Sequence, residues 1–158
     1  MSPKNNVMIL EHNSSDNQYL HKDFHGALCY AIKYLDQTYG PDAAAEYLQQ
    51  VGREIFSPLS AALKEDGPIA IERHFKHIFE LEDGNAKFEC KNDQLTIEVL
   101  KCPAIAHLQS TGQLFTNRYC ETTVNVNKAV CEVAGYECSC EYIPGGGKCT
   151  QKFWKKVK

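Results

Sequence analysis

The hydrophobic positions in the first half of the chain recur every three to four residues, a period typical of amphipathic helices. This pattern predicts helices over residues 16–39, 42–64 and 69–82. Pro58 falls inside the second of them, and proline removes a helical hydrogen bond and clashes with the preceding turn. We therefore expect the second helix to bend or break near residues 54–58.

Beyond residue 84 the hydrophobic period falls from 3.6 to 2, which is typical of half-buried strands. Residues 86–90 and 95–99 alternate between apolar and polar side chains and predict a β-hairpin. A further helix is predicted over residues 116–134. A second hairpin follows, with strands over residues 136–143 and 148–154 joined by a glycine-rich turn.

The second hairpin is expected to bury one of its faces. If Tyr142 lies opposite Cys149, the charged side chains of the two strands share the other face, which is then solvated. The expected buried face consists of Tyr136, Cys138, Cys140, Tyr142, Cys149 and Phe153. The chain as a whole is predicted to be α+β, with N-terminal helices packed on an antiparallel sheet made of two hairpins with an intervening helix.

Length and composition indicate one globular domain. The chain has 158 residues, of which 43% are hydrophobic and 23% charged. We expect a single domain over residues 1–158, with residues 1–15 as a flexible N-terminal segment. Its formal net charge of −3 and lack of a basic surface pattern argue against nucleic-acid binding, and no apolar run has the length of a membrane span.

Cysteine is the residue that most changes this picture. Six of the eight cysteines lie between Cys102 and Cys149. The first residues show neither the basic segment nor the apolar stretch of an export signal, so we expect a cytoplasmic protein with reduced thiols. Metal ligation, thiol chemistry and plain packing then remain as alternatives for these side chains.

One group of candidate residues surrounds the end of the first hairpin. Cys102 is expected to end a strand, and His107 follows it in a predicted loop, where functional groups are common. The Cys102 thiol could act as a nucleophile, as a soft metal ligand or as a small apolar side chain. Together with Cys120 these residues form a candidate catalytic or metal-binding set.

Four further residues are candidates for substrate binding. His21 and His25 are four residues apart and point the same way on a helix, although two hydrogen-bonded histidines would show the same spacing. Arg118 can bind a carboxylate with two parallel hydrogen bonds, or can simply be a solvated residue. Asn127 shares the predicted helical face of Cys120, where a buried amide needs polar partners.

A second set of cysteines surrounds Gly135. Cys138 and Cys140 share a strand face and can meet Cys131 from the preceding helix, which suggests an alternative metal cluster, with zinc as a candidate metal. The chain has no CxxC pair, so packing stays open as an interpretation of these side chains. Cys29 and Cys90 fall at expected core positions.

Three segments of the chain resemble the L-2-amino-thiazoline-4-carboxylate hydrolase family: the strand ending at Cys102-Pro103, the Arg118-Tyr119-Cys120 segment, and the closing hairpin from Gly135 to Cys149. The resemblance implies a hydrolase that opens a cyclic isothiourea to an N-carbamoyl-cysteine-like product. Such a reaction needs an activated water or thiolate, a proton donor for the departing sulfur and a cation for the substrate carboxylate. The resemblance would make Cys102 the nucleophile or a metal ligand, and His107, His21 or His25 the acid, base or ligand. Cys120 would line the same pocket, and Arg118 would hold the carboxylate.

The end of the chain also resembles the vinyl-reductase-like small-molecule-binding domains, some of which bind zinc through cysteines placed like Cys131 and Cys138. This resemblance implies a binding or sensor module for a hydrophobic ligand, a tetrapyrrole or a metal. The chain departs from that pattern at Lys128, where an acidic residue is expected. In either case we expect a small-molecule partner, and the hairpin around Cys90 suggests a homodimer through its edge.

Overall fold

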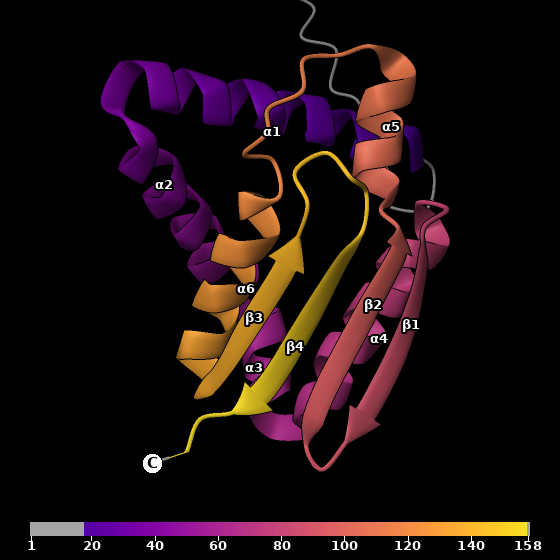
Figure 1. The fold of residues 1–158 in the computed structure, drawn as a ribbon. Helices are drawn as coiled ribbons and strands as arrows, with labels where there is room; N and C mark the ends of the chain where they lie inside the picture. Colours follow the sequence, from indigo (N-terminus) through magenta and orange to yellow (C-terminus); the bar gives the residue numbers. More distant parts are fainter. Residues whose placement is uncertain (1–17, 158) are drawn as a thin grey trace, which may run out of the picture.

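Among the residues that the structure describes, four helices precede a four-stranded antiparallel sheet, and two more helices lie between its hairpins (Figure 1). The computed structural model describes the backbone of residues 18–157 and the side chains of residues 22–157, so the segment 1–15 lies outside the described residues. The elements are α1 (Gln18–Tyr39), α2 (Pro41–Glu54), α3 (Ser57–Asp66), α4 (Pro68–Leu81), β1 (Asn85–Lys91), β2 (Gln94–Lys101), α5 (Pro103–Thr111), α6 (Glu121–Ala134), β3 (Tyr136–Tyr142) and β4 (Cys149–Lys155). The α+β prediction is confirmed.

The two hairpins join into one sheet with the strand order β1-β2-β4-β3. The central contact pairs β2 with β4 in antiparallel register, with Leu95 opposite Phe153. Tyr142 lies opposite Cys149, so the register assumed for the expected buried face is the one observed. β1 lies at an edge of the sheet, and its pairing with a second copy stays a prediction.

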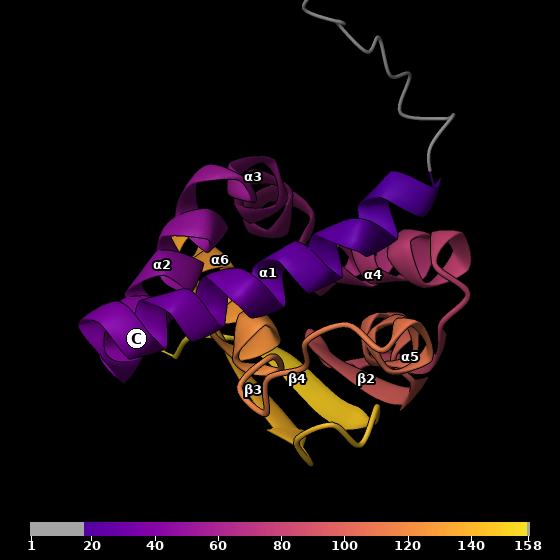
Figure 2. The same cartoon turned by 90° about the horizontal axis from the view of Figure 1, so that it is seen from above.

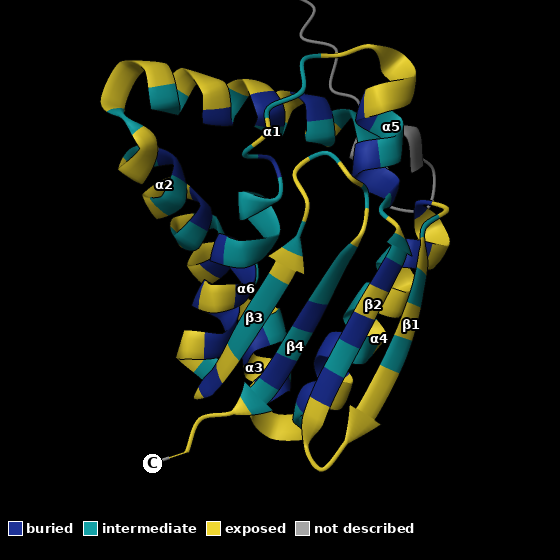
Figure 3. Cartoon of the chain, in the orientation of Figure 1, coloured by how far each residue is buried: buried dark blue, intermediate teal, exposed yellow. Residues whose placement is uncertain are grey.

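The helices cover one face of the sheet and leave the other face open (Figures 1 and 2). Buried positions concentrate on the central strands, whereas β1 is mostly exposed (Figure 3). Leu95 and Ile97 of β2 and Phe153 of β4 are fully buried under these helices. The alternation along each strand therefore places one apolar set in the core and one polar set in solvent.

α2 and α6 pack closely at Gly52. A Cβ atom added there would lie 2.8 Å from the Ala129 Cβ and 2.9 Å from the Val126 carbonyl oxygen. Only a residue without a side chain permits this approach. The contact fixes α6, and with it the segment that carries Tyr119 and Cys120, against the first half of the chain.

Two predicted helices have different bounds in the structure. The expected helix over 42–64 divides into α2 and α3, and Pro58 lies in the first turn of α3, so the predicted interruption is confirmed. The helix predicted over 116–134 begins at Glu121, because residues 117–120 form a turn. No helix among the described residues has the length and apolar character needed to cross a bilayer.

Two other sequence-based expectations are wrong. Residues 103–111 form helix α5, so His107 lies on a helix and not in a loop. Pro103 ends the strand, but it also begins the helix, because proline is well suited to a first turn whose N–H groups have no partner in the helix. Cys90 is exposed on the edge strand β1, whereas Cys29 is fully buried.

Candidate functional site

A cavity of about 240 Å³ lies where the start of α1, the end of α4 and the start of α5 meet. Its wall combines one buried carboxylate, one imidazole and two lysines with small side chains. The lining residues are Lys22, Glu82, Asp83, Lys101, Pro103, Ala106, His107 and Ser110. Concave sites with a few convergent polar groups are the usual form of small-molecule sites.

Glu82 is the buried carboxylate of this wall and is only 4% exposed. The other carboxylate, Asp83, is exposed and accepts a hydrogen bond from Lys101 at 2.8 Å. The Glu82 Oε2 lies 2.8 Å from Nε2 of His25, and Nδ1 of the same ring lies 2.6 Å from the Tyr119 hydroxyl. A carboxylate can only accept a hydrogen bond, so in the neutral ring Nε2 carries the proton and Nδ1 accepts the proton of Tyr119. Burial, reinforced by nearby thiols and Glu82, raises the pKa of Tyr119 well above its ordinary value, so the phenol stays protonated.

His107 brings a second imidazole to the cavity from helix α5. Its ring centre lies 6.4 Å from that of His25. Its Nε2 is buried, and within the described part of the chain it makes no hydrogen bond; the Asp23 carboxylate lies 3.9 Å away. A carboxylate and an imidazole thus face the same cavity, an arrangement that suits general acid–base chemistry.

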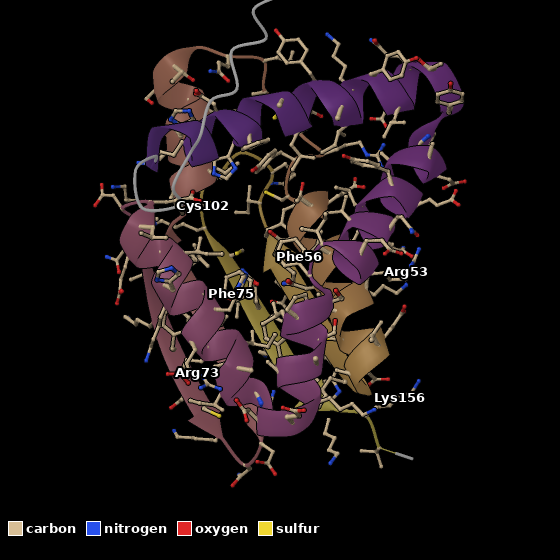
Figure 4. All side chains as sticks on the ribbon, turned by 180° about the vertical axis from the view of Figure 1, so that it is seen from behind. Arg53, Phe56, Arg73, Phe75, Cys102 and Lys156 are labelled. Atoms are coloured by element: carbon tan, nitrogen blue, oxygen red, sulfur yellow. The ribbon has the colours of Figure 1, made fainter. Side chains whose placement is uncertain are left out.

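Cys102 caps the N-terminus of α5 and lies beneath α1 (Figure 4). Its side chain is half-buried and packs against two apolar clusters of the core. Burial raises the pKa of the Cys102 thiol, although the amides of Ala104 and Ile105 oppose the shift. Burial, followed by the nearby Cys102, also raises the pKa of Cys120 to about 11. Both sulfurs therefore rest as thiols at neutral pH, and neither lines the cavity.

Arg118 does not line the cavity, and its partly exposed side chain is held by contacts within the protein. Its guanidinium donates to Asp36, to both carboxylate oxygens of Glu121 and, at 3.1 Å, to the Pro41 carbonyl oxygen. The Glu121 carboxylate, with Asp36, raises the pKa of Arg118. These contacts join the start of α6 to the α1–α2 corner. Lys22 and Lys101 are the cations that line the cavity.

Asn127 takes part in a buried polar pair of the core. Its Nδ2 donates to Oε1 of Gln151 at 2.9 Å, and Gln151 Nε2 lies 3.5 Å from the Cys149 sulfur. Asn127 and Gln151 are 7% and 3% exposed, so water does not replace a lost partner easily. The pair ties α6 to the central strand β4.

Asn127→Ala is expected to lower the free energy of unfolding by about 2 kcal/mol, because it leaves the buried Gln151 oxygen without its donor. Chemical denaturation of the variant and the wild type measures this difference. The double variant Asn127→Ala/Gln151→Leu, which removes both partners, should recover part of the loss. If the double variant were instead less stable than Asn127→Ala by about another 2 kcal/mol, the two side chains would act independently.

The predicted metal ligands do not assemble into a metal centre. Within the described residues no group of three or more histidine, cysteine, aspartate or glutamate side chains is placed to hold a metal ion. Cys131 instead pairs with Cys138, and Cys140 with Cys149. All eight cysteines are free thiols. Neither the set Cys102, His107 and Cys120 nor the set Cys131, Cys138 and Cys140 therefore fits zinc in this structure, and the side chain of His21 lies outside the described residues.

The sequence argument identified His25 and His107 but missed Glu82 and Tyr119. Glu82 follows Ile78 and Phe79 by four and three residues, so it occupies a position of the apolar stripe of α4. Because acidic residues are rarely buried without a partner, a glutamate in line with these apolar positions could have indicated a buried, hydrogen-bonded carboxylate. Tyr119 gave no periodic signal, since it precedes α6 in a turn.

Comparisons of the chain with protein-family models, with curated proteins and with solved structures give no match.

Proposed function

We propose that the protein is a hydrolase that opens the ring of a small cyclic isothiourea bearing a carboxylate, such as 2-amino-thiazoline-4-carboxylate. The observation that carries the proposal is the convergence of Glu82 and His107 on one small cavity with Lys22 and Lys101 on its wall. These groups supply a base, an acid and, in Lys22, a cation for the substrate carboxylate, whereas Lys101 is paired with Asp83.

Glu82 is the base in the proposed reaction. It takes a proton from a water molecule, whose oxygen bonds to the ring carbon between nitrogen and sulfur. The bond from this carbon to the ring sulfur then breaks, and the sulfur takes a proton from the His107 imidazolium. One water is consumed, and the product carries a free thiol and a carbamoyl group. Proton exchange with solvent restores Glu82 and His107.

His25 and Tyr119 are positioning residues in this scheme. The chain of hydrogen bonds from Tyr119 through His25 to Glu82 fixes one orientation of the carboxylate, with 2.6 Å and 2.8 Å contacts. Side chains that form hydrogen bonds to a reacting group, without reacting themselves, hold that group in its productive geometry. Asp23, 3.9 Å from His107 Nε2, is the anion that can pair with the protonated ring.

The proposal is tested by incubating the wild-type protein with 2-amino-thiazoline-4-carboxylate and separating substrate from ring-opened product by chromatography. Multiple turnovers are expected. Cys102→Ala should retain activity, with a loss well below the factor of about 10² that removal of a catalytic acid or base typically causes, because the Cys102 thiol packs in the core. Binding without product formation would contradict the hydrolase proposal, and a loss of 10²-fold or more in Cys102→Ala would return the nucleophile role to this thiol.

A second candidate function is a non-catalytic small-molecule-binding module of the vinyl-reductase-like kind. It is favoured by a larger cavity of about 530 Å³ beside the second hairpin, lined by aromatic and thiol side chains such as Tyr136, Trp154 and Cys138. Saturable binding of an apolar ligand, with no turnover of the thiazoline, is the result that would favour this alternative.

A further inference from the structure

The 530 Å³ cavity lies between α6 and β3 and shares no lining residue with the cavity at Glu82. Cys131 of α6 and Cys138 of β3 both line it, although they enter from different elements. Its volume lies within the range of about 300–1,000 Å³ that is usual for sites of small-molecule ligands. The cavity is lined by these two thiols, together with that of Cys140 on β3.

The thiols of Cys131 and Cys138 lie in one packed region, because Cys131 belongs to the buried core cluster against which Cys138 packs. Cys138 is half-buried, whereas Cys131 is only 1% exposed. A small disulfide in the cavity therefore reaches Cys138 first, with Cys131 as the partner behind it. A hydrogen bond from Cys131 lowers the pKa of Cys138 against the effects of burial and Glu132, and Lys128 also lowers it.

The charged side chains on the cavity wall are balanced in sign. Lys128 and Lys156 provide two cations, and Glu132 and Glu137 provide two carboxylates; Lys156 follows the end of β4 (Figure 4). Lys128 lies 3.9 Å from Glu132, and Glu137 accepts a hydrogen bond from Trp154 at 3.0 Å. A ligand that carries both ammonium and carboxylate groups fits this wall better than one with charges of a single sign.

We infer that Cys138 and Cys131 form a thiol–disulfide exchange site for low-molecular-weight disulfides with both ammonium and carboxylate groups, of which oxidised glutathione and cystine are examples. This site is independent of the hydrolase proposed above, because the two cavities are separate and lined by different residues.

The exchange proceeds in two steps, in which every bond formed replaces a bond broken. The Cys138 thiolate attacks one sulfur of the small disulfide, forms a mixed disulfide and releases the other half as a thiolate. The Cys131 thiol then loses its proton and attacks the Cys138 sulfur, which releases the second half and leaves a Cys131–Cys138 bridge. The protein dithiol loses two electrons, and the small disulfide gains them and becomes two thiols.

Cys140 offers a matched control for this assignment. It lines the same cavity and lies on the same face of β3, two residues beyond Cys138, but it is hydrogen-bonded to Cys149. If Cys131 resolves the mixed disulfide, Cys140→Ser should behave like the wild type. Cys90, exposed on β1, controls for reaction at any accessible thiol.

The test is to incubate the reduced full-length protein with excess oxidised glutathione and measure intact and peptide masses without reduction. The wild type is expected to lose two hydrogens and to show a Cys131–Cys138 bridge, with the glutathionyl adduct only transient. In Cys131→Ser the adduct on Cys138 should become the main species, and in Cys138→Ser adduct and bridge at this pair should both be lost. Cys140→Ser and Cys90→Ser should retain the wild-type bridge.

Several outcomes would overturn the inference: no bridge in the wild type, a bridge between Cys140 and Cys149 instead, or accumulation of the adduct in Cys140→Ser but not in Cys131→Ser. Because Cys131 is buried, the folding of each serine variant is checked by its thermal transition. If Cys131→Ser does not fold, the wild type is exposed briefly to oxidised glutathione and its peptide masses are measured. The first glutathionyl adduct is then expected on Cys138. A first adduct on any other thiol contradicts the assignment.

Discussion

Glu82→Gln is expected to lower kcat/KM for the thiazoline by about 10³-fold, the middle of the range for loss of a general base. Glutamine keeps the size of the side chain and can still bond to His25, but its amide cannot take a proton from water. The substitution therefore separates the chemistry of Glu82 from its structural role. A reduction of this size corresponds to about 4 kcal/mol of lost transition-state stabilisation.

Glu80→Gln is the matched control for this experiment. Glu80 lies in the last turn of α4, two residues before Glu82 at the end of that helix, and its side chain is exposed. The same chemical change at this position should leave kcat/KM unaltered, because Glu80 does not line the cavity. Equal effects of the two substitutions would contradict the assignment of Glu82 as the base.

The positioning role of Tyr119 can be separated from that of Glu82 by comparing kcat with KM. Tyr119→Phe removes the hydroxyl that bonds to His25 but keeps the buried ring. If the tyrosine only orients His25, kcat should fall by less than in Glu82→Gln, while KM stays unchanged. A change in KM alone would contradict the positioning role.

The sequence predicted the local elements well because each rests on a period or a turn that neighbouring residues determine. The second hairpin was expected from the alternation on both sides of its glycine-rich turn, and its strands pair with Tyr142 opposite Cys149, the register assumed for its buried face. Helix α5 was missed because Pro103 was interpreted as the end of a strand and not also as the first residue of a helix. Proline permits both, so the ambiguity is physical.

The site was harder to predict than the fold, since its residues come from distant parts of the chain. Glu82 meets His25 across 57 positions, and Tyr119 meets the same ring across 94. No local pattern encodes such contacts. Arg118 was expected to bind the carboxylate of a substrate. It does bind carboxylates, but these are Asp36 and Glu121 of the protein itself.

The cysteines illustrate how burial decides between chemistry and packing. Cys102 drew attention through its place at a strand end, yet burial keeps its thiol protonated. Cys138 is also half-buried, but a hydrogen bond from the Cys131 thiol lowers its pKa against the effects of burial and Glu132. Both residues are half-buried cysteines, and only their neighbours in the folded structure give their thiols different pKa shifts.

Phe153→Ala is expected to lower the free energy of unfolding by about 4 kcal/mol, within the range for removal of a large buried aromatic side chain. Phe153 is fully buried on the central strand β4, where it lies opposite Leu95 of β2 on one side and Cys138 of β3 on the other. Its ring centre is 6.3 Å from that of Phe75 on α4. It therefore joins both hairpins and the helical layer, and no single neighbour can fill the space it would leave.

Urea denaturation of the wild type and the variant measures the effect as a lower midpoint at an unchanged slope. Phe24→Ala provides the matched control, since the same atoms are removed from a side chain that is 69% exposed on α1. That substitution should change the free energy of unfolding by no more than about 0.5 kcal/mol. If the two variants shifted the midpoint equally, Phe153 would not hold the sheet to the helices, because only its burial between the hairpins and α4 distinguishes the two phenylalanines.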